Sequence, residues 1–214
     1  YDPKTVFSSI DLHGRYAFGN QPNIAEWNLA RFAEALLPLF KAEKNKTIEI
    51  AEQEISKFKD IFKIYFTEMM KRKLGLITNE GGDDSMIKDF FQIMHENEAD
   101  YNNTFVYLMN NSLAQEKLIH NKKFIHWKNK WLLRISRKQD IIKAKEIMQK
   151  NNPIIIPRNH LVEQALGQAE QGDLSLFKKL LSTLKNPYQD QEGIDSFKQP
   201  RPYSEKGYQT FCGT

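Results

Sequence analysis

The 214-residue sequence has few of the features that cross-link a fold or anchor it in a membrane. Its single cysteine, Cys212, excludes an internal disulfide framework and a cysteine-rich zinc site, and fits a reducing compartment. Charged residues interrupt every apolar run well before the roughly 20 residues that span a bilayer. No stretch resembles a signal peptide. We therefore expect a soluble, cytoplasmic protein with no membrane partner.

Neither sign of charge dominates the chain. The chain has 31 Lys and Arg residues and 27 Asp and Glu residues, so its net charge is +4. This charge is too small by itself to indicate nucleic-acid binding. The local distribution is uneven. Residues 80–103 carry seven acids and one base (net −6), whereas residues 116–150 carry eleven bases and three acids (net +8). With 40% hydrophobic residues, the composition is that of a globular protein with a core.

Apolar residues recur at helical spacing along most of the chain. The pattern predicts a first helix from Ile24, capped by Asn23 and stopped near Pro38, and one long helix over 47–74, ended by Gly75. Further helices are predicted near 86–94, 100–110, 124–135, 141–148, 158–171 and 174–184, the last capped by Asp173. The β-branched run 154–156 lies between two prolines and favours a buried extended connector. The predicted fold class is all-α.

Glycine and proline positions divide the chain into three parts. Residues 1–23 are predicted to form an ordered loop, residues 24–186 a helical body, and residues 187–214 an irregular C-terminal tail. The opening Tyr1 follows no helix or strand pattern, so we expect the chain to begin inside a larger protein.

Metal chemistry is not indicated by the sequence. The histidines show neither an HExxH motif nor paired spacing for metal ligation. Glu80, Asp83 and Asp84 lack the alternating oxygen ligands of a calcium loop and predict an exposed, solvated turn. No metal site is expected.

Trp127 and Trp131 lie four residues apart among lysines, a pattern with two interpretations. It is typical of core anchors on a helix with a basic solvent face, and it also occurs where aromatic side chains stack on nucleic-acid bases. We favour the core and do not expect a nucleic-acid partner. The alternative function is a non-enzymatic helical binding module that uses the basic segment 117–150.

Polar residues of the predicted N-terminal loop form the main candidate site. Asp11, Arg15, Asn20 and Arg31 lie near aromatic residues at the junction of loop and helix, where binding sites are often built. The alternative is that Arg15 pairs with a carboxylate only to hold the loop. Cys212, near the end of the tail, is a candidate redox residue or an inert thiol.

Several motifs resemble those of the selenoprotein O family, in the same order along nearly the whole chain. Residues 41–150 resemble the family in helical character more than in motif. The matching motifs are Ser9-Ile10-Asp11, Gly14-Arg15-Tyr16-Ala17-Phe18-Gly19-Asn20-Gln21-Pro22, Trp27-Asn28-Leu29, Pro157-Arg158-Asn159-His160-Leu161, Gly172-Asp173-Leu174, Asn186-Pro187-Tyr188 and Cys212-Gly213-Thr214.

The resemblance implies a protein-kinase-like fold and transfer of AMP from ATP, with Mg²⁺ or Mn²⁺, to Ser, Thr or Tyr hydroxyls of proteins. Uridylylation is also implied by bacterial relatives. In the family, the nucleotide- and metal-binding residues precede the region that matches Tyr1, so no catalytic, cofactor-binding or metal residue is assigned here. We expect a C-terminal fragment, or a gene remnant, that is inactive alone. Its expected partners are the N-terminal kinase-like core of the same protein and protein substrates.

The resemblance also suggests roles for individual residues. The loop bearing Asp11, Arg15 and Tyr16 is expected to face the nucleotide or the substrate hydroxyl. Cys212 matches the family's selenocysteine or cysteine position, which in bacterial members can pair with a cysteine of the activation segment. Here Phe7 aligns with that cysteine, so this internal disulfide cannot form.

Overall fold

The computed structural model describes residues 1–40, 43–138 and 140–201, and these ranges contain helices and no strand. The predicted all-α class is confirmed. Among the described residues, one compact unit comprises residues 2–68 and the other comprises Tyr1 and residues 69–201, so the boundary falls within a helix. No helix in these ranges is both long and apolar enough to cross a bilayer.

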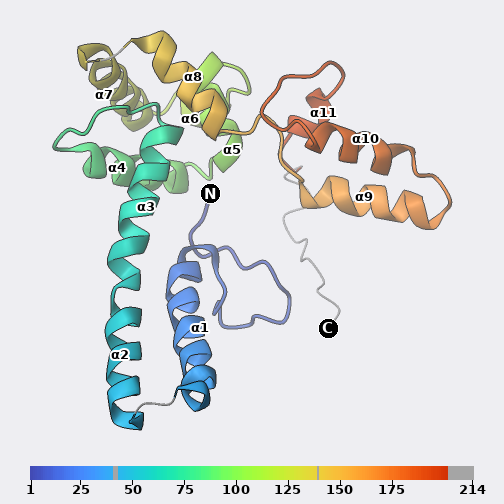
Figure 1. Cartoon of the computed structure of the whole chain (residues 1–214). Coiled ribbons are helices and arrows are strands. Elements are labelled where there is room, and N and C mark those ends of the chain that lie inside the picture. The colour runs from blue at the N-terminus through green and yellow to red at the C-terminus, as the bar shows by residue number, and fades with distance from the viewer. Residues whose placement is uncertain (41–42, 139, 202–214) are drawn as a thin grey trace. The chain divides into compact units, whose positions relative to one another are not determined.

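The unit of residues 2–68 has an ordered loop followed by helices, of which α1 and α2 lie side by side (Figure 1). We expected the first helix to be capped by Asn23, but it begins at Gln21. Asn20 occupies the N-cap position, and the Asn23 amide donates a hydrogen bond to it. The shift reflects Pro22, whose fixed φ suits the first helical turn. The elements are η1 (Phe18–Asn20), α1 (Gln21–Leu36), η2 (Leu37–Leu39), α2 (Lys44–Ser56) and the start of α3 (Phe58–Lys73).

The single long helix predicted over 47–74 is divided into α2 and α3. At Lys57 the backbone N–H is shared between the carbonyl oxygens of Glu54 and Ile55, which tightens the turn between the two helices. No glycine or proline occurs near Lys57, and the helical spacing of apolar residues continues through the break. The sequence therefore gives no sign that the helix is divided.

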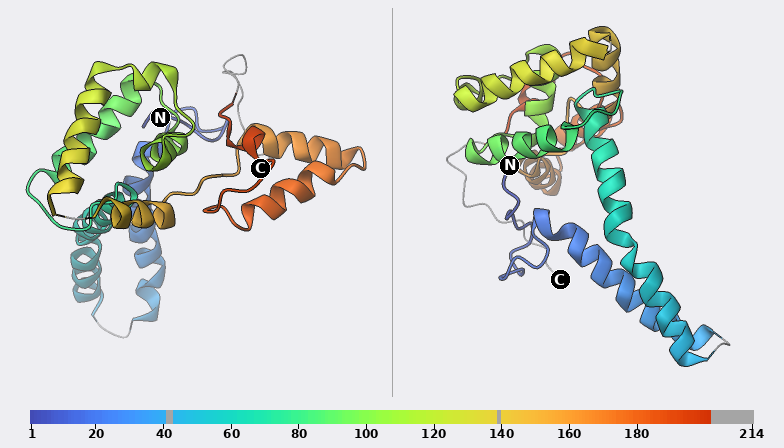
Figure 2. Two further views of the ribbon diagram at one scale, coloured as in Figure 1. Left: turned by 90° about the horizontal axis from the view of Figure 1, so that it is seen from above. Right: turned by 90° about the vertical axis from the view of Figure 1, so that its left-hand side faces the viewer.

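The unit of residues 69–201 packs its helices largely in pairs. α4 pairs with α7, and α9 with α10; the α9–α10 hairpin is visible in Figure 2. The elements after α3 are α4 (Asp83–Glu96), α5 (Tyr101–Asn110), α6 (Glu116–Ile119), α7 (Lys122–Lys138), α8 (Ile141–Asn151), α9 (Asn159–Glu170), α10 (Ser175–Leu184) and α11 (Asp195–Lys198).

An aromatic stack forms the core between α4 and α7. The Phe90 ring lies 4.4 Å from that of Trp127, which is followed by Trp131 at 6.1 Å. Both indole N–H groups donate to backbone carbonyls, of Met86 and Leu74 respectively. All three side chains are buried, which confirms the prediction that the tryptophans are core anchors. Buried indoles offer no stacking surface to nucleic-acid bases.

The acidic turn is exposed at Gly81, Gly82 and Asp84 as predicted, but Asp83 is buried. Its carboxylate accepts from Arg134 Nε at 2.9 Å and from Arg134 Nη2 at 3.2 Å. Arg134 Nη1 also lies 3.2 Å from a Glu80 oxygen. The partners are 51 residues apart in sequence, so the local pattern of acids gives no sign of this buried pair.

Gly75 ends α3 as predicted. It has φ +69°, and Leu76 N–H donates to the Lys71 carbonyl, closing a Schellman turn. A Cβ atom at this position would lie 2.9 Å from the Ala144 carbonyl oxygen. Both the backbone conformation and the close approach of α8 therefore require glycine.

The described part of the tail is more ordered than the irregular tail we predicted from residue 187. Ile194, just before α11, and Phe197 within it pack into an apolar cluster that contains Leu161 of α9 and Leu180 of α10. This burial holds the segment in place. The connector at 154–156 lies outside the helices, and Ile154 and Ile155 are buried as predicted. The chain bends at Ile154 instead of being extended, and the N–H groups of Ile154 and Ile155 both donate to the Pro187 carbonyl.

The C-terminal ends of α3 and α8 are joined by a reciprocal pair of caps. Lys73 Nζ donates to the Asn151 carbonyl at 3.2 Å, and the Asn152 amide donates to the Lys73 carbonyl at 2.8 Å. The Lys73 ammonium also lies 4.5 Å from the centre of the Phe105 ring. Burial lowers the pKa of Lys73 from 10.5 to about 8.

This lowered pKa predicts a pH-dependent stability. Between pH 8 and 10.5 the unfolded chain keeps the proton on Lys73 while the folded protein loses it, so stability rises with pH across this window. We expect the unfolding free energy of the wild type to increase relative to that of Lys73→Met between these pH values. Denaturant titrations at several pH values measure this difference, and a constant difference would contradict the prediction.

Candidate functional site in the N-terminal loop

The loop of residues 2–20 is held closed by its own backbone. Phe18 N–H donates to the Thr5 carbonyl and Gly19 N–H to the Pro3 carbonyl, at 2.9 and 2.7 Å. A Cβ atom at Gly19 would lie 3.0 Å from both the carbonyl oxygen and the Cβ of Pro3. Glycine at this position therefore allows the two ends of the loop to approach closely.

Asp11 organises the tip of this loop. Its two carboxylate oxygens accept hydrogen bonds from the backbone N–H groups of Arg15 and Tyr16, both at 2.8 Å. Gly14, which lies between Asp11 and Arg15 in the sequence, has φ +66°, which allows the chain to turn. Asp11 thus fixes the backbone from which Arg15 and Tyr16 project.

The Arg15 side chain is held against the first helix. Its guanidinium lies 4.4 Å from the centre of the Trp27 ring, and the Arg31 guanidinium lies 5.4 Å from the same ring. Two side chains complete the junction: Asn20 donates to the Arg15 carbonyl and Gln21 to the Tyr16 carbonyl. The predicted gathering of polar and aromatic residues at this junction is therefore present.

The alternative in which Arg15 pairs with a carboxylate does not describe this loop. In the described ranges no carboxylate lies within ion-pair distance of Arg15, and Asp11 binds backbone amides instead. Arg15 and Tyr16 are both exposed. The loop thus presents a guanidinium, which is suited to binding phosphate or carboxylate oxygens, beside a phenol hydroxyl.

Arg158 belongs to the matching motif of residues 157–161, and its role is structural. Its guanidinium binds both carboxylate oxygens of Asp100, at 2.7 and 3.3 Å, and also donates to the Asn103 side-chain oxygen. Asp100 caps α5 by accepting from the Asn103 N–H. The Arg158 motif therefore fixes the start of α5. Cys212 lies outside the described residues.

A hollow that the sequence pattern does not indicate lies between α4 and α7, where Asp89, His126 and Lys130 are exposed at the surface. The sequence gives one weak indication of a shared site, because His126 and Lys130 lie one helical turn apart on α7. Asp89 belongs to another helix, and only the packing of α4 on α7 brings it to the same hollow.

Comparison with known proteins identifies the family. The family model described as protein adenylyltransferase SelO matches residues 1–185. Proteins called protein nucleotidyltransferase YdiU are similar throughout: those of Pelagibacter ubique (strain HTCC1062) and Syntrophotalea carbinolica are 44% identical, and that of Clostridium botulinum (strain Hall) is 46% identical. These alignments cover 100% of this chain and 44% of each relative, so the chain spans less than half the length of the relatives. The match to the family model over most of the chain shows that this chain belongs to the SelO family.

Proposed function

We propose that this chain is the C-terminal helical part of a protein adenylyltransferase with a kinase-like fold, which transfers AMP from ATP to Ser, Thr or Tyr hydroxyls of proteins. In this transfer the hydroxyl loses its proton to water and its oxygen bonds to the α-phosphorus. The bond from the α-phosphorus to the oxygen that bridges to the β-phosphate breaks, and pyrophosphate leaves. The observation that carries the proposal is the similarity along the whole chain to relatives called protein nucleotidyltransferases.

The role proposed for the N-terminal loop is positioning. Asp11 fixes the backbone of Arg15 and Tyr16, and Trp27 holds the Arg15 guanidinium in place. A guanidinium held in this way is suited to a phosphate or to an acidic side chain of the substrate protein, because it loses little freedom on binding. We propose that this loop faces the nucleotide or the substrate hydroxyl.

The residues described here do not fit the divalent metal that the reaction would use. Within the described ranges, no group of three or more His, Cys, Asp or Glu side chains is arranged to hold a metal ion. The Asp11 oxygens both accept backbone N–H groups. We therefore assign no step of the reaction to a metal bound by these residues, and propose that ATP and Mg²⁺ or Mn²⁺ are held by the part of the enzyme that this chain does not span.

The partner proposed for the unit of residues 2–68 is that same remaining part of the enzyme. Among its described residues only Ala17 and Thr47 are buried, whereas large apolar side chains are exposed on α1 and α3, among them Phe32 (61%), Ile64 (61%) and Tyr65 (71%). Exposed apolar surface of this kind is typical of an interface. The relatives are more than twice as long as this chain, so they contain a further part that would cover it.

The proposed activity is tested with the full-length protein, ATP and either Mg²⁺ or Mn²⁺. We expect radioactivity from α-labelled ATP to become covalently attached to protein, and none from γ-labelled ATP. A parallel reaction with α-labelled UTP distinguishes AMP from UMP transfer. Labelling from γ-labelled ATP would instead indicate phosphorylation, and absence of α-label with both metals would contradict the proposal.

The positioning role of the loop is tested by Asp11→Ala. This change removes the acceptors for two backbone amides, so Arg15 and Tyr16 lose their fixed place, and we expect labelling to fall roughly 10- to 100-fold. The matched control is Asp173→Ala, because Asp173 likewise accepts a backbone N–H, from Ser175, at an exposed turn. Equal labelling by the two variants would contradict the proposed role.

A further inference from the structure

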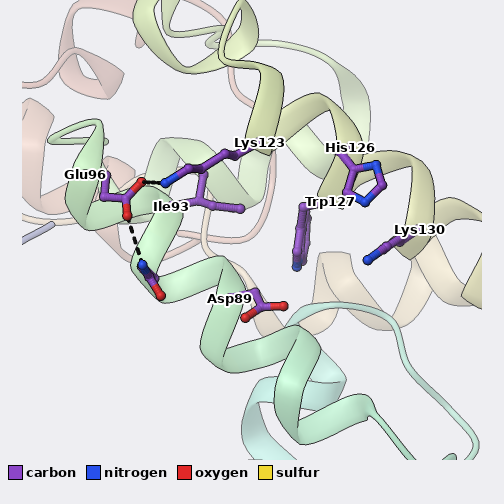
Figure 3. A pocket seen from close by; sticks show the side chains of 8 residues that line it. Asp89, Ile93, Glu96, Lys123, His126, Trp127 and Lys130 are labelled. Atoms are coloured by element: carbon purple, nitrogen blue, oxygen red, sulfur yellow. Dashed lines mark hydrogen bonds and ion pairs between the residues drawn. The ribbon is translucent and has the colours of Figure 1, made fainter.

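A hollow of about 300 Å³ lies between α4 and α7, within the unit of residues 69–201 (Figure 3). Each helix contributes residues to its lining, which consists of Asp89, Gln92, Ile93, Glu96, Lys123, His126, Trp127 and Lys130. This volume is at the lower end of the range for small-molecule sites in proteins.

Internal interactions already satisfy the polar groups at one end of the hollow. The Lys123 ammonium lies 2.7 Å from a Glu96 oxygen, and Gln92 donates to the other Glu96 oxygen at 2.9 Å. These hydrogen bonds, that from Lys123 first, lower the pKa of Glu96. Figure 3 shows this linked group beside Ile93. The opposite charges of Glu96 and Lys123 therefore cancel at this end of the hollow.

The apolar part of the lining comes from Ile93 and Trp127, both of which are buried. The Trp127 indole N–H is already bonded to the Met86 carbonyl, so the indole offers the hollow no free donor. A ligand that occupied the hollow would place its own apolar group here.

The other end holds polar side chains that have no partner within the described part of the protein. Asp89, His126 and Lys130 are exposed, and within the described part of the chain none of their side chains makes a hydrogen bond or an ion pair. One carboxylate from α4 thus shares the hollow with an ammonium and an imidazole from α7. An anion alone would be repelled by Asp89, and a cation alone by Lys130. The complementary ligand carries both charges.

We propose that this hollow binds a free α-amino acid with an apolar side chain. Lys130 and His126 bind its carboxylate, Asp89 binds its ammonium group, and Ile93 and Trp127 contact its side chain. Such a molecule matches the hollow in charge and in polarity, and it is small enough to fit within about 300 Å³. This binding is independent of the proposed transfer reaction.

Saturation-transfer NMR titrations of the full-length protein test the proposal with L-leucine, N-acetyl-L-leucine and L-leucinamide. These probes share a side chain and differ in charge, being a zwitterion, an anion and a cation. We expect leucine to bind roughly tenfold more tightly than either derivative, since each derivative leaves one charged group of the hollow unpaired. Failure of leucine to bind, or equal binding of the three probes, would overturn the proposal.

Charge-reversal variants locate the binding and separate it from a loss of folding. Lys130→Glu leaves two carboxylates and should prefer leucinamide, whereas Asp89→Lys leaves two ammonium groups and should prefer N-acetyl-leucine. Control variants Lys122→Glu and Asp84→Lys reverse exposed charges on the same helices outside the lining, and should keep the wild-type preference. Unchanged preferences in Lys130→Glu and Asp89→Lys, or equal changes in the controls, would overturn the proposal.

Discussion

Replacing Arg134 with methionine is expected to lower the free energy of unfolding of the unit of residues 69–201 by about 3–5 kcal/mol. The arginine is 2% exposed, and it binds the buried Asp83 through two nitrogens. Methionine fills a similar volume but removes both guanidinium hydrogen bonds to the buried Asp83 carboxylate, which then keeps only the more distant Lys71 ammonium, at 4.0 Å, as a cation. Removing one partner of such a pair costs far more than the pair itself contributes.

Two further variants make this expectation specific. Arg137→Met alters an exposed arginine one turn further along α7 and should change stability by less than about 0.5 kcal/mol. The double variant Asp83→Leu with Arg134→Met removes both charges and should recover most of the loss. Urea titrations of the full-length protein, followed by tryptophan fluorescence, measure all three. A loss below about 1 kcal/mol in Arg134→Met would contradict the buried pair.

Phe90→Ala is expected to destabilise the same unit by about 3–5 kcal/mol through a different mechanism. The Phe90 side chain is fully buried, stacks on Trp127 and meets the edge of Phe105 with ring centres 5.3 Å apart. Alanine would leave a cavity that these rings cannot fill without losing their own contacts.

The matched control for Phe90→Ala is Ile125→Ala, because Ile125 on α7 is 44% exposed. Its truncation should cost less than about 1 kcal/mol. The same urea titrations compare the two variants. Similar losses from both would indicate that the aromatic stack does not form the core between α4 and α7.

The helices were predictable from the sequence because their signals are local. Apolar spacing indicated where most of them lie, and Gly75 marked the end of α3. The break at Lys57 was not predictable, because it arises from a shared hydrogen bond that no glycine or proline announces. The Asp83–Arg134 pair was not predictable either, since long-range packing decides whether an acidic turn is solvated or buried.

The candidate loop site was predictable only as a set of residues. Asp11, Arg15 and Tyr16 were singled out by their motif, and the structure places them on one turn. The residue order does not specify that Asp11 binds backbone amides or that Arg15 lies over Trp27. Both contacts depend on the three-dimensional geometry of the loop. Only the structure brings Asp89, His126 and Lys130 to one hollow.

We propose that this chain supports a transfer reaction whose nucleotide- and metal-binding residues lie in another part of the enzyme. The most direct measurement compares the isolated 214-residue chain, shown to be helical by circular dichroism, with the full-length protein under identical conditions with α-labelled ATP and Mg²⁺ or Mn²⁺. We expect covalent labelling by the full-length protein and none by the isolated chain. Covalent labelling by the isolated chain would contradict it.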